Sequence, residues 1–169
     1  ENRATIGRQF FSILGHIHAR DAASAPLAAF APVPERCWQR ELEYWANEIS
    51  KDALEPQPIA HGVIRWLRAN PPPEPAKLTV VHGDYRTGNV LHDGQGRITA
   101  VLDWEMAHLG DPHEDLAWAL DPLWNITRDE SAGGLLPFAE AISLWEASSG
   151  LRFDADVFRW WEMWATIKG

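Results

Sequence analysis

The feature that most constrains this chain is a pair of short apolar runs joined by a tight turn, within a sequence that otherwise has helical spacing. Asp-Gly-Gln-Gly at 93–96 is a strong turn signal, and apolar runs flank it at 89–92 and 97–102. Two such runs around a glycine-containing turn predict an antiparallel hairpin. A further strand is expected at 78–81, just before a polar loop at 82–88. Any fold for this chain must therefore place a small β element among helices.

Apolar residues recur at spacings of three and four over most of the remaining chain, which is typical of helices packed on one face. In 4–20, for example, Phe10, Leu14 and Ile17 fall on one stripe. An Ala- and Pro-rich stretch at 21–34 is expected to be a loop. The predicted helices are 4–20, 35–50, 58–69, 112–121, 134–149 and 154–167. The expected fold class is mainly α with a small β-hairpin element, that is, α+β.

Composition excludes several classes of protein. No apolar run approaches the roughly 18 residues that a membrane-spanning helix needs, so no membrane partner is expected. The first residues lack the basic, apolar and small-residue segments of a signal peptide. A lone cysteine, Cys37, excludes an internal disulfide and fits a reducing compartment. These features predict a cytoplasmic protein.

Charge is distributed unevenly along the chain. The net charge is −9, and residues 81–169 account for it, with fifteen acidic and six basic side chains. Nucleic-acid binding needs clustered Lys and Arg, so a nucleic-acid partner is not expected. An acidic half is compatible with a divalent metal ion or a cationic substrate.

Polar residues gather at the ends of the two predicted hairpin strands. Antiparallel pairing about the turn is expected to set Asn89 opposite Ala100 and to bring Asn89 and Asp103 to the open end of the hairpin. The loop that carries Asp84 lies over that end. Mg²⁺ prefers one or two carboxylates together with phosphate oxygens and water. Asp-x-x-x-x-Asn followed by a hairpin and a second Asp is the arrangement used for phosphoryl transfer in kinases.

The motifs at 82–89 (His-Gly-Asp-Tyr-Arg-Thr-Gly-Asn), 102–105 (Leu-Asp-Trp-Glu) and 110–117 (Gly-Asp-Pro-His-Glu-Asp-Leu-Ala) together resemble the aminoglycoside phosphotransferase family. That family shares the protein-kinase-like fold and includes choline and homoserine kinases. Within it, the stretch is most similar to kinase-like domains related to those fused to acyl-CoA dehydrogenases. The matching motifs cover about residues 78–120.

The resemblance implies an ATP-dependent kinase acting on the hydroxyl group of a small molecule, with GTP as an alternative donor. It implies that Asp84 is the catalytic base and that Asn89 and Asp103 bind Mg²⁺. No Gly-rich loop follows a strand, and the first lysine, Lys51, lies at a predicted helix end. Residues 1–169 are therefore expected to be the C-terminal, mostly helical lobe, without the N-terminal nucleotide-binding lobe. A lobe face exposed in this way favours self-association.

Three further residues near the motif have two interpretations each. His82 is expected to orient the backbone of the loop more than to transfer protons. Arg86 either contacts a phosphate or an anionic substrate, or is exposed to solvent. Glu105 either reaches the metal ion through water or is an exposed acid at a strand end.

The segment that begins the helix at 112–121 is also acidic. Asp111 is expected to cap this helix and to form a capping box with Glu114, with Pro112 at the first helical position. Asp115 either stabilises the helix through its dipole or, as the resemblance implies, braces the catalytic loop. Both interpretations remain open from the sequence.

Two other functions also remain open. A non-catalytic kinase-like binding module would need the fold but no turnover, and a metal-dependent phosphohydrolase would need only the metal cluster. The ten tryptophans are interpreted chiefly as core or lobe-interface packing. An aromatic cage for a quaternary ammonium group is the alternative.

Overall fold

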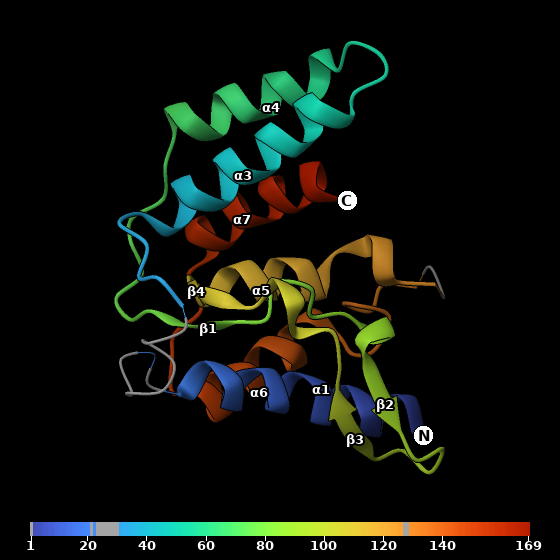
Figure 1. The fold of residues 1–169 in the computed structure, drawn as a ribbon. Coiled ribbons are helices and arrows are strands. Elements are labelled where there is room, and N and C mark those ends of the chain that lie inside the picture. The colour runs from blue at the N-terminus through green and yellow to red at the C-terminus, as the bar shows by residue number, and fades with distance from the viewer. Residues whose placement is uncertain (1, 21, 23–30, 127–128) are drawn as a thin grey trace.

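The computed structural model describes residues 2–20, 22, 31–126 and 129–169, and it confirms a mainly helical fold with small β elements (Figure 1). The lower layer of Figure 1 holds α1 (Asn2–Ala19) and α6 (Phe138–Ser149). The upper layer holds α3 (Cys37–Asp52), α4 (Pro58–Ala69) and α7 (Ala155–Lys168). Between them lie α5 (Pro112–Leu120), β1 (Thr79–Val81) and β4 (His108–Gly110). The hairpin strands are β2 (Val90–His92) and β3 (Ile98–Val101).

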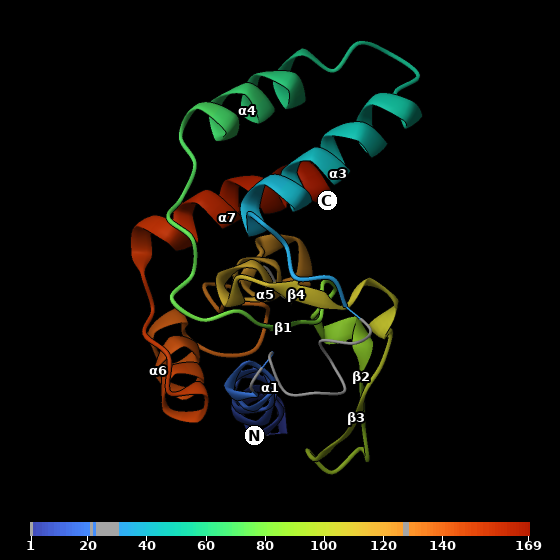
Figure 2. The ribbon, with the colours of Figure 1, turned by 60° about the vertical axis from the view of Figure 1, so that its left-hand side comes forward.

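Close packing of α1 on α6 builds the lower layer. A Cβ atom on Gly15 would collide with the Ser148 side chain, so glycine allows the two helices to approach. Figure 2 shows the β2–β3 hairpin on the opposite side of α1 from α6. Gln9 ties the hairpin to α1, because its Nε2 donates to the Gly96 carbonyl (2.6 Å) and its Oε1 accepts from the Ile98 amide (3.1 Å).

Aromatic side chains fill the space between the layers. Six of the ten tryptophans are buried, and an aromatic side chain removes roughly 150–250 Å² from water. The Trp160 indole donates to the Leu67 carbonyl (3.2 Å) and so links α7 to the end of α4. Core packing is therefore the main role of the tryptophans. The buried ones are Trp38, Trp118, Trp145, Trp160, Trp161 and Trp164.

The β elements form two separate two-stranded sheets. β1 pairs antiparallel with β4, and β2 pairs antiparallel with β3. The predicted register was wrong by two residues, because Leu91, and not Asn89, lies opposite Ala100. The turn is longer than expected. The Asp93 amide donates to the Arg97 carbonyl (3.0 Å), so the turn spans the five residues from 93 to 97. Asn89 is then level with Leu102, whose amide donates to its carbonyl (2.8 Å).

The predicted helices agree with the observed ones to within a few residues, except at 134–149. That helix begins only at Phe138, because Gly133 and Gly134 have φ of +57° and +72°, which a right-handed helix does not use. Most of the predicted loop at 21–34 lies outside the described residues. Among the helices that are described, none is both long and apolar enough to cross a membrane.

Candidate active site

Asp84 lies in the loop between β1 and the short 3-10 helix η1 (Thr87–Asn89). Its Oδ1 accepts from the Trp118 indole (2.6 Å), and its Oδ2 accepts from Asn89 Nδ2 (2.7 Å). The Arg86 guanidinium Nε lies 3.1 Å from Oδ2. The side chain of Asp84 nevertheless keeps 16% of its surface exposed. The carboxylate is thus held in one orientation while one side stays open to a ligand.

Asp115, on α5, holds the backbone of the same loop. Its Oδ2 accepts from the His82 amide (2.6 Å) and its Oδ1 from the Gly83 amide (2.9 Å). His18 Nδ1 accepts from the Trp145 indole (2.9 Å), so its Nε2 carries the proton and donates to Asp115 (3.2 Å). Burial alone would raise the pKa of Asp115, but these donors hold it below its usual range. Asp115 therefore braces the loop.

His82 links the loop to the hairpin. Its Nδ1 accepts from the Asp84 amide (3.2 Å), and its Nε2 therefore donates to the Leu102 carbonyl (2.9 Å). Both ring nitrogens are used and the side chain is fully buried. The arrangement fits orientation of the backbone and leaves no free nitrogen for proton transfer.

Asn89 and Asp103 both lie at the open end of the hairpin. Asn89 Nδ2 donates both to the carboxylate and to the carbonyl (2.9 Å) of Asp84, which leaves Oδ1 without a hydrogen bond from the described residues. Asp103 follows Leu102, the neighbour of Asn89 across the hairpin. Its carboxylate is exposed and caps no backbone amide of the helix that follows. Two oxygen ligands are therefore available on adjoining strand ends.

The backbone at Asp103 is strained. With φ +65° and ψ +58°, it is the only non-glycine residue of the described chain in the left-handed region. Asp and Asn tolerate this conformation better than other side chains, at a cost of about 1–2 kcal/mol. Such strain is concentrated at functional sites, where the surrounding structure imposes it.

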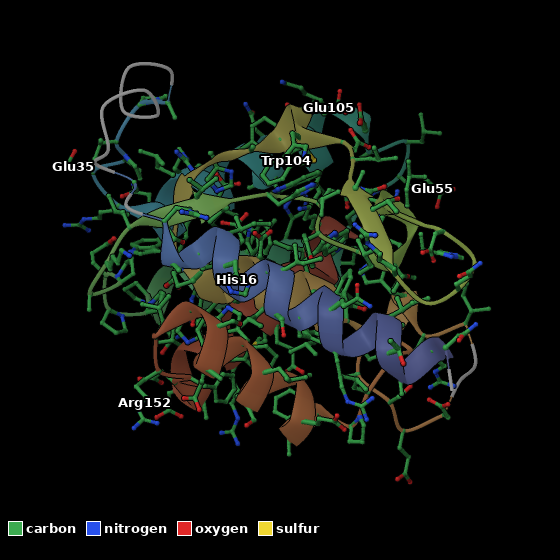
Figure 3. The ribbon with its side chains drawn as sticks, turned by 90° about the horizontal axis from the view of Figure 1, so that it is seen from below. His16, Glu35, Glu55, Trp104, Glu105 and Arg152 are labelled. Atoms are coloured by element: carbon green, nitrogen blue, oxygen red, sulfur yellow. The ribbon has the colours of Figure 1, made fainter. Side chains whose placement is uncertain are left out.

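Arg86 and Glu105 differ in how firmly they are held. Arg86 pairs with Asp84, and its guanidinium carbon lies 4.9 Å from the ring centre of Trp124. Glu105 belongs to the 3-10 helix η2 (Trp104–Met106) and is exposed, beside Trp104, at the rim seen in Figure 3. Arg86 is thus part of the fixed loop, whereas Glu105 is not.

The capping prediction was half right. Asp111 caps α5, because its Oδ1 accepts from the His113 amide (2.9 Å), and Pro112 occupies the first helical position. The prediction that Glu114 completes a capping box was wrong. Its Oε2 instead lies 3.2 Å from His108 Nε2 on β4. The attraction between the imidazole and the carboxylate draws Glu114 into the interior.

Lys168 also belongs to the site, and the sequence analysis missed it. Its Nζ donates to the Gly83 carbonyl, directly before Asp84. The same ammonium lies over the rings of Trp118 (4.4 Å), Trp164 (5.1 Å) and Trp45 (5.4 Å). Burial lowers its pKa. A basic residue in the last turn of a helix usually faces solvent; its spacing of four from Trp164 was the available signal.

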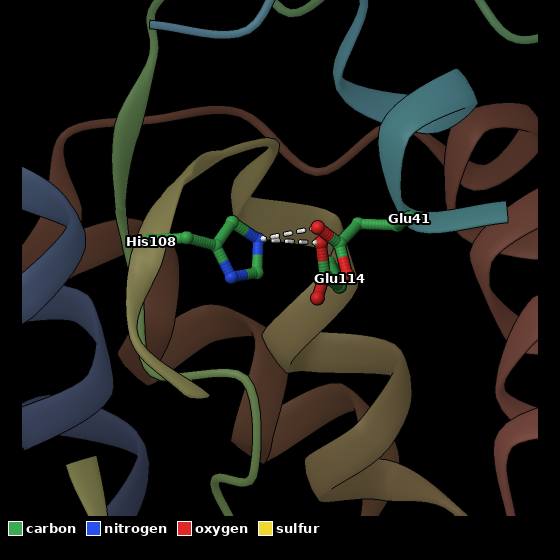
Figure 4. A group of neighbouring side chains, drawn as sticks. All are labelled: Glu41, His108 and Glu114. Carbon is green, nitrogen blue, oxygen red and sulfur yellow. Dashed lines mark hydrogen bonds and ion pairs between the residues drawn. The ribbon is translucent and has the colours of Figure 1, made fainter. Parts of the chain in front are cut away.

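A second, largely buried cluster of Glu41, His108 and Glu114 was likewise missed (Figure 4), because Glu41 lies far earlier in the sequence than His108 and Glu114. Burial alone would lower the pKa of His108, but the neighbouring carboxylates raise it to about 9. Burial raises the pKa of Glu114. Only folding brings these groups together.

Comparison with known sequences agrees with this geometry. The model of the phosphotransferase enzyme family matches residues 1–163. Acyl-CoA dehydrogenase family member 11 of Gallus gallus is 33% identical over 107 residues, which are 63% of this chain and 14% of that protein. Viomycin phosphotransferase of Streptomyces vinaceus is 29% identical over 122 residues, 66% of this chain and 39% of that protein.

Solved structures show the same architecture. A protein of Ralstonia eutropha, provisionally described as an aminoglycoside phosphotransferase, superposes with a TM-score of 0.83 at 26% identity, over 99% of this chain and 53% of that one. Macrolide 2'-phosphotransferase type I shares the fold, with a TM-score of 0.72 at 19% identity over the same shares. The chain spans about half of these structures and less of the curated relatives. With the family model matching nearly its whole length, the chain belongs to the phosphotransferase enzyme family.

Proposed function

We propose that the chain is the catalytic lobe of an enzyme that transfers the γ-phosphate of ATP to a hydroxyl group of a small molecule. The proposal is supported by the fixed, partly open carboxylate of Asp84, which Asn89 hydrogen-bonds, and by oxygens without a hydrogen bond on Asn89 and on Asp103 at the adjoining strand end. A base must be fixed and accessible, whereas metal ligands need oxygens that the protein does not already use.

Asp84 would accept the proton of the substrate hydroxyl as the hydroxyl oxygen attacks the phosphoryl group. Trp118 and Asn89 fix the two carboxylate oxygens, so the hydroxyl meets an acceptor that needs no reorientation. Arg86 balances the charge of Asp84 and keeps its position over Trp124. Asp115, His82 and Lys168 hold the backbone on which Asp84 depends.

The oxygen donors fit Mg²⁺, since Asn89 Oδ1 and the Asp103 carboxylate accept no hydrogen bond from the described residues and both are hard ligands. When bound, Mg²⁺ neutralises charge on the transferring phosphate. Asn89 and Asp103 would hold the ion, Asp103 from a backbone in the left-handed region.

The donor is proposed to be ATP, with GTP as the alternative, and a further nucleotide-binding lobe is proposed to complete the site. The acceptor is proposed to be a small molecule with a hydroxyl group, and one relative is named viomycin phosphotransferase. We place the reaction in the cytoplasm. Self-association through exposed apolar side chains such as Leu54 and Ile59 stays a prediction that sedimentation tests.

The deciding experiment is a thermal-shift titration with Mg-ATP on the 169-residue chain and on a chain extended upstream in the native gene. Ligand at about 100 times its Kd stabilises a fold by roughly 2.7 kcal/mol. We expect a Mg²⁺-dependent shift, in the longer chain at least, that Asp103→Ala removes and Asp93→Asn, at the exposed hairpin turn, does not.

Turnover separates the alternatives. The longer chain should transfer phosphate to hydroxyl acceptors, and Asp84→Asn should abolish the transfer. Release of phosphate from esters without an acceptor, lost in Asp84→Asn, would favour a phosphohydrolase. Mg-ATP binding without any turnover would favour the binding module. Transfer that survives Asp84→Asn would contradict the proposal.

A further inference from the structure

Glu41 on α3, His108 on β4 and Glu114 on α5 point toward one another in the interior (Figure 4). His108 Nε2 lies 3.2 Å from Glu114 Oε2 and 3.5 Å from Glu41 Oε1. One potential ligand atom from each residue lies within 4.8 Å of the others. None of these residues belongs to the pair that is proposed to bind Mg²⁺.

Glu114 is not fully satisfied in this arrangement. Only 2% of its surface is exposed, and its Oε1 is buried without a hydrogen-bond partner among the described residues. A buried carboxylate oxygen without a donor is costly, so native structures usually supply a donor or a cation. The unpaired oxygen belongs to a carboxylate directed at His108 and Glu41, and it is an observation independent of the clustering.

His108 is oriented as metal-binding histidines are. Its Nδ1 lies 2.9 Å from the Met106 carbonyl. Because a carbonyl only accepts, Nδ1 carries the proton, and Nε2 is the nitrogen available to a metal ion. Histidine ligands of metals are commonly fixed by such a bond from the other ring nitrogen.

The spacing of the ligand atoms fits a small divalent ion. Bonds of about 2.0–2.1 Å in a tetrahedral site set neighbouring ligand atoms about 3.3 Å apart. The separations from His108 Nε2 to the two carboxylates, 3.2 and 3.5 Å, bracket this value. All three ligand atoms lie within 4.8 Å of one another, so the two carboxylates would adjust to close around an ion.

We propose that Glu41, His108 and Glu114 bind a divalent first-row transition-metal ion, with Zn²⁺ as the best match to one imidazole and two carboxylates. Glu41 and His108 line a cavity of about 370 Å³ together with Tyr44 and Glu105. The cavity provides an entry path and space for a water molecule as the fourth ligand. The ion would fasten α3 to the β4–α5 unit.

A metal-free ion-pair network is the competing arrangement. In it, a protonated His108 lies between the two carboxylates, while Arg40 Nε binds Glu41 Oε1 (2.9 Å). The Lys168 ammonium adds positive charge near Glu114. Zn²⁺ must displace the proton from Nε2 against these cations, so direct binding measurements distinguish the two arrangements.

The test is a calorimetric titration of ZnCl₂ into the chelator-treated 169-residue chain at pH 7.5. We expect one ion per chain. Glu114→Gln and His108→Ala should each weaken binding more than about 100-fold, because loss of a residue that merely supports a ligand already costs roughly 10–100-fold. Glu43→Gln is the matched control, because Glu43 lies on α3 with Glu41 but pairs with Arg68. It should leave zinc affinity unchanged. Asp103→Ala should also leave zinc affinity intact.

The wild-type chain provides a readout that does not depend on folded variants. Co²⁺ in place of Zn²⁺ should give the intense visible absorption of a tetrahedral site, and a zinc-soaked crystal should show an anomalous peak between the three side chains. Absence of zinc binding, a peak elsewhere, or affinity unchanged in folded Glu114→Gln and His108→Ala would overturn the proposal. The last two outcomes would assign the bound zinc to exposed histidines such as His61.

Discussion

The loop that carries Asp84 and the segment that carries Asp103, which we propose form one site, are held in opposite ways. Around Asp84, protein groups bind both carboxylate oxygens, and Asp115 binds the backbone just before it. Asp103 has an exposed carboxylate on a strained backbone. The difference fits the two proposed roles: a base has to be in place before the substrate arrives, whereas a metal ligand has to keep its oxygens free.

The largest effect on stability is expected when Asp115, which holds the Asp84 loop, is changed. In Asp115→Asn, an NH₂ group replaces one acceptor, so a buried loop amide or His18 loses its partner. We expect a loss of about 3–5 kcal/mol in the free energy of unfolding, measured with urea at pH 7. Asp121→Asn, which alters an exposed cap on Leu123, should cost less than about 1 kcal/mol.

The same variant has a pH dependence of known sign. The folded protein lowers the pKa of Asp115, so its stabilisation is present above the unfolded value of 3.8 and is lost as the pH falls through the folded value. The stability difference between wild type and Asp115→Asn should therefore shrink below about pH 4. A difference that grows on acidification would contradict this account of the loop.

A smaller effect is expected when Asp84 loses one donor. Trp118→Phe removes the indole N–H that binds Asp84 Oδ1 and keeps most of the ring surface. We expect a loss of about 1–2 kcal/mol in unfolding free energy and a fall in phosphate transfer by the extended chain. Trp160→Phe removes a comparable donor, to the Leu67 carbonyl, and is the matched control. Equal losses of transfer in both variants would refute a specific role for Trp118.

The smallest effect on stability is expected at Asp103, whose backbone is strained. Asp103→Gly relieves the left-handed backbone, whereas Asp103→Ala keeps the strain and removes the carboxylate as well. We expect the glycine variant to be about 1 kcal/mol more stable than the alanine variant by chemical denaturation. Both variants should lose the Mg²⁺-dependent shift. Equal stability of the two would mean that the backbone at Asp103 carries no strain.

Most of the fold was accessible from the sequence, whereas the roles of the candidate site residues stay predictions. Helical spacing of apolar residues located the helices, and the contiguous motif from Asp84 to Asn89 indicated the loop. Features that depend on distant partners could not be predicted from the sequence. The three-residue strand β4 pairs with a strand far earlier in the chain, and Lys168 reaches the Gly83 carbonyl across the molecule. Neither has a local pattern that distinguishes it from a loop or a solvated helix end.

The bonds from Trp145 through His18 to Asp115 have a consequence for folding. They connect α6, α1 and α5 to the amides of His82 and Gly83, so the loop takes its shape only when segments from both ends of the chain have docked. Such long-range contacts form late and are lost with the whole structure. These two amides should therefore exchange hydrogen with solvent only when the whole structure unfolds, and no partly folded species would hold Asp84 in place.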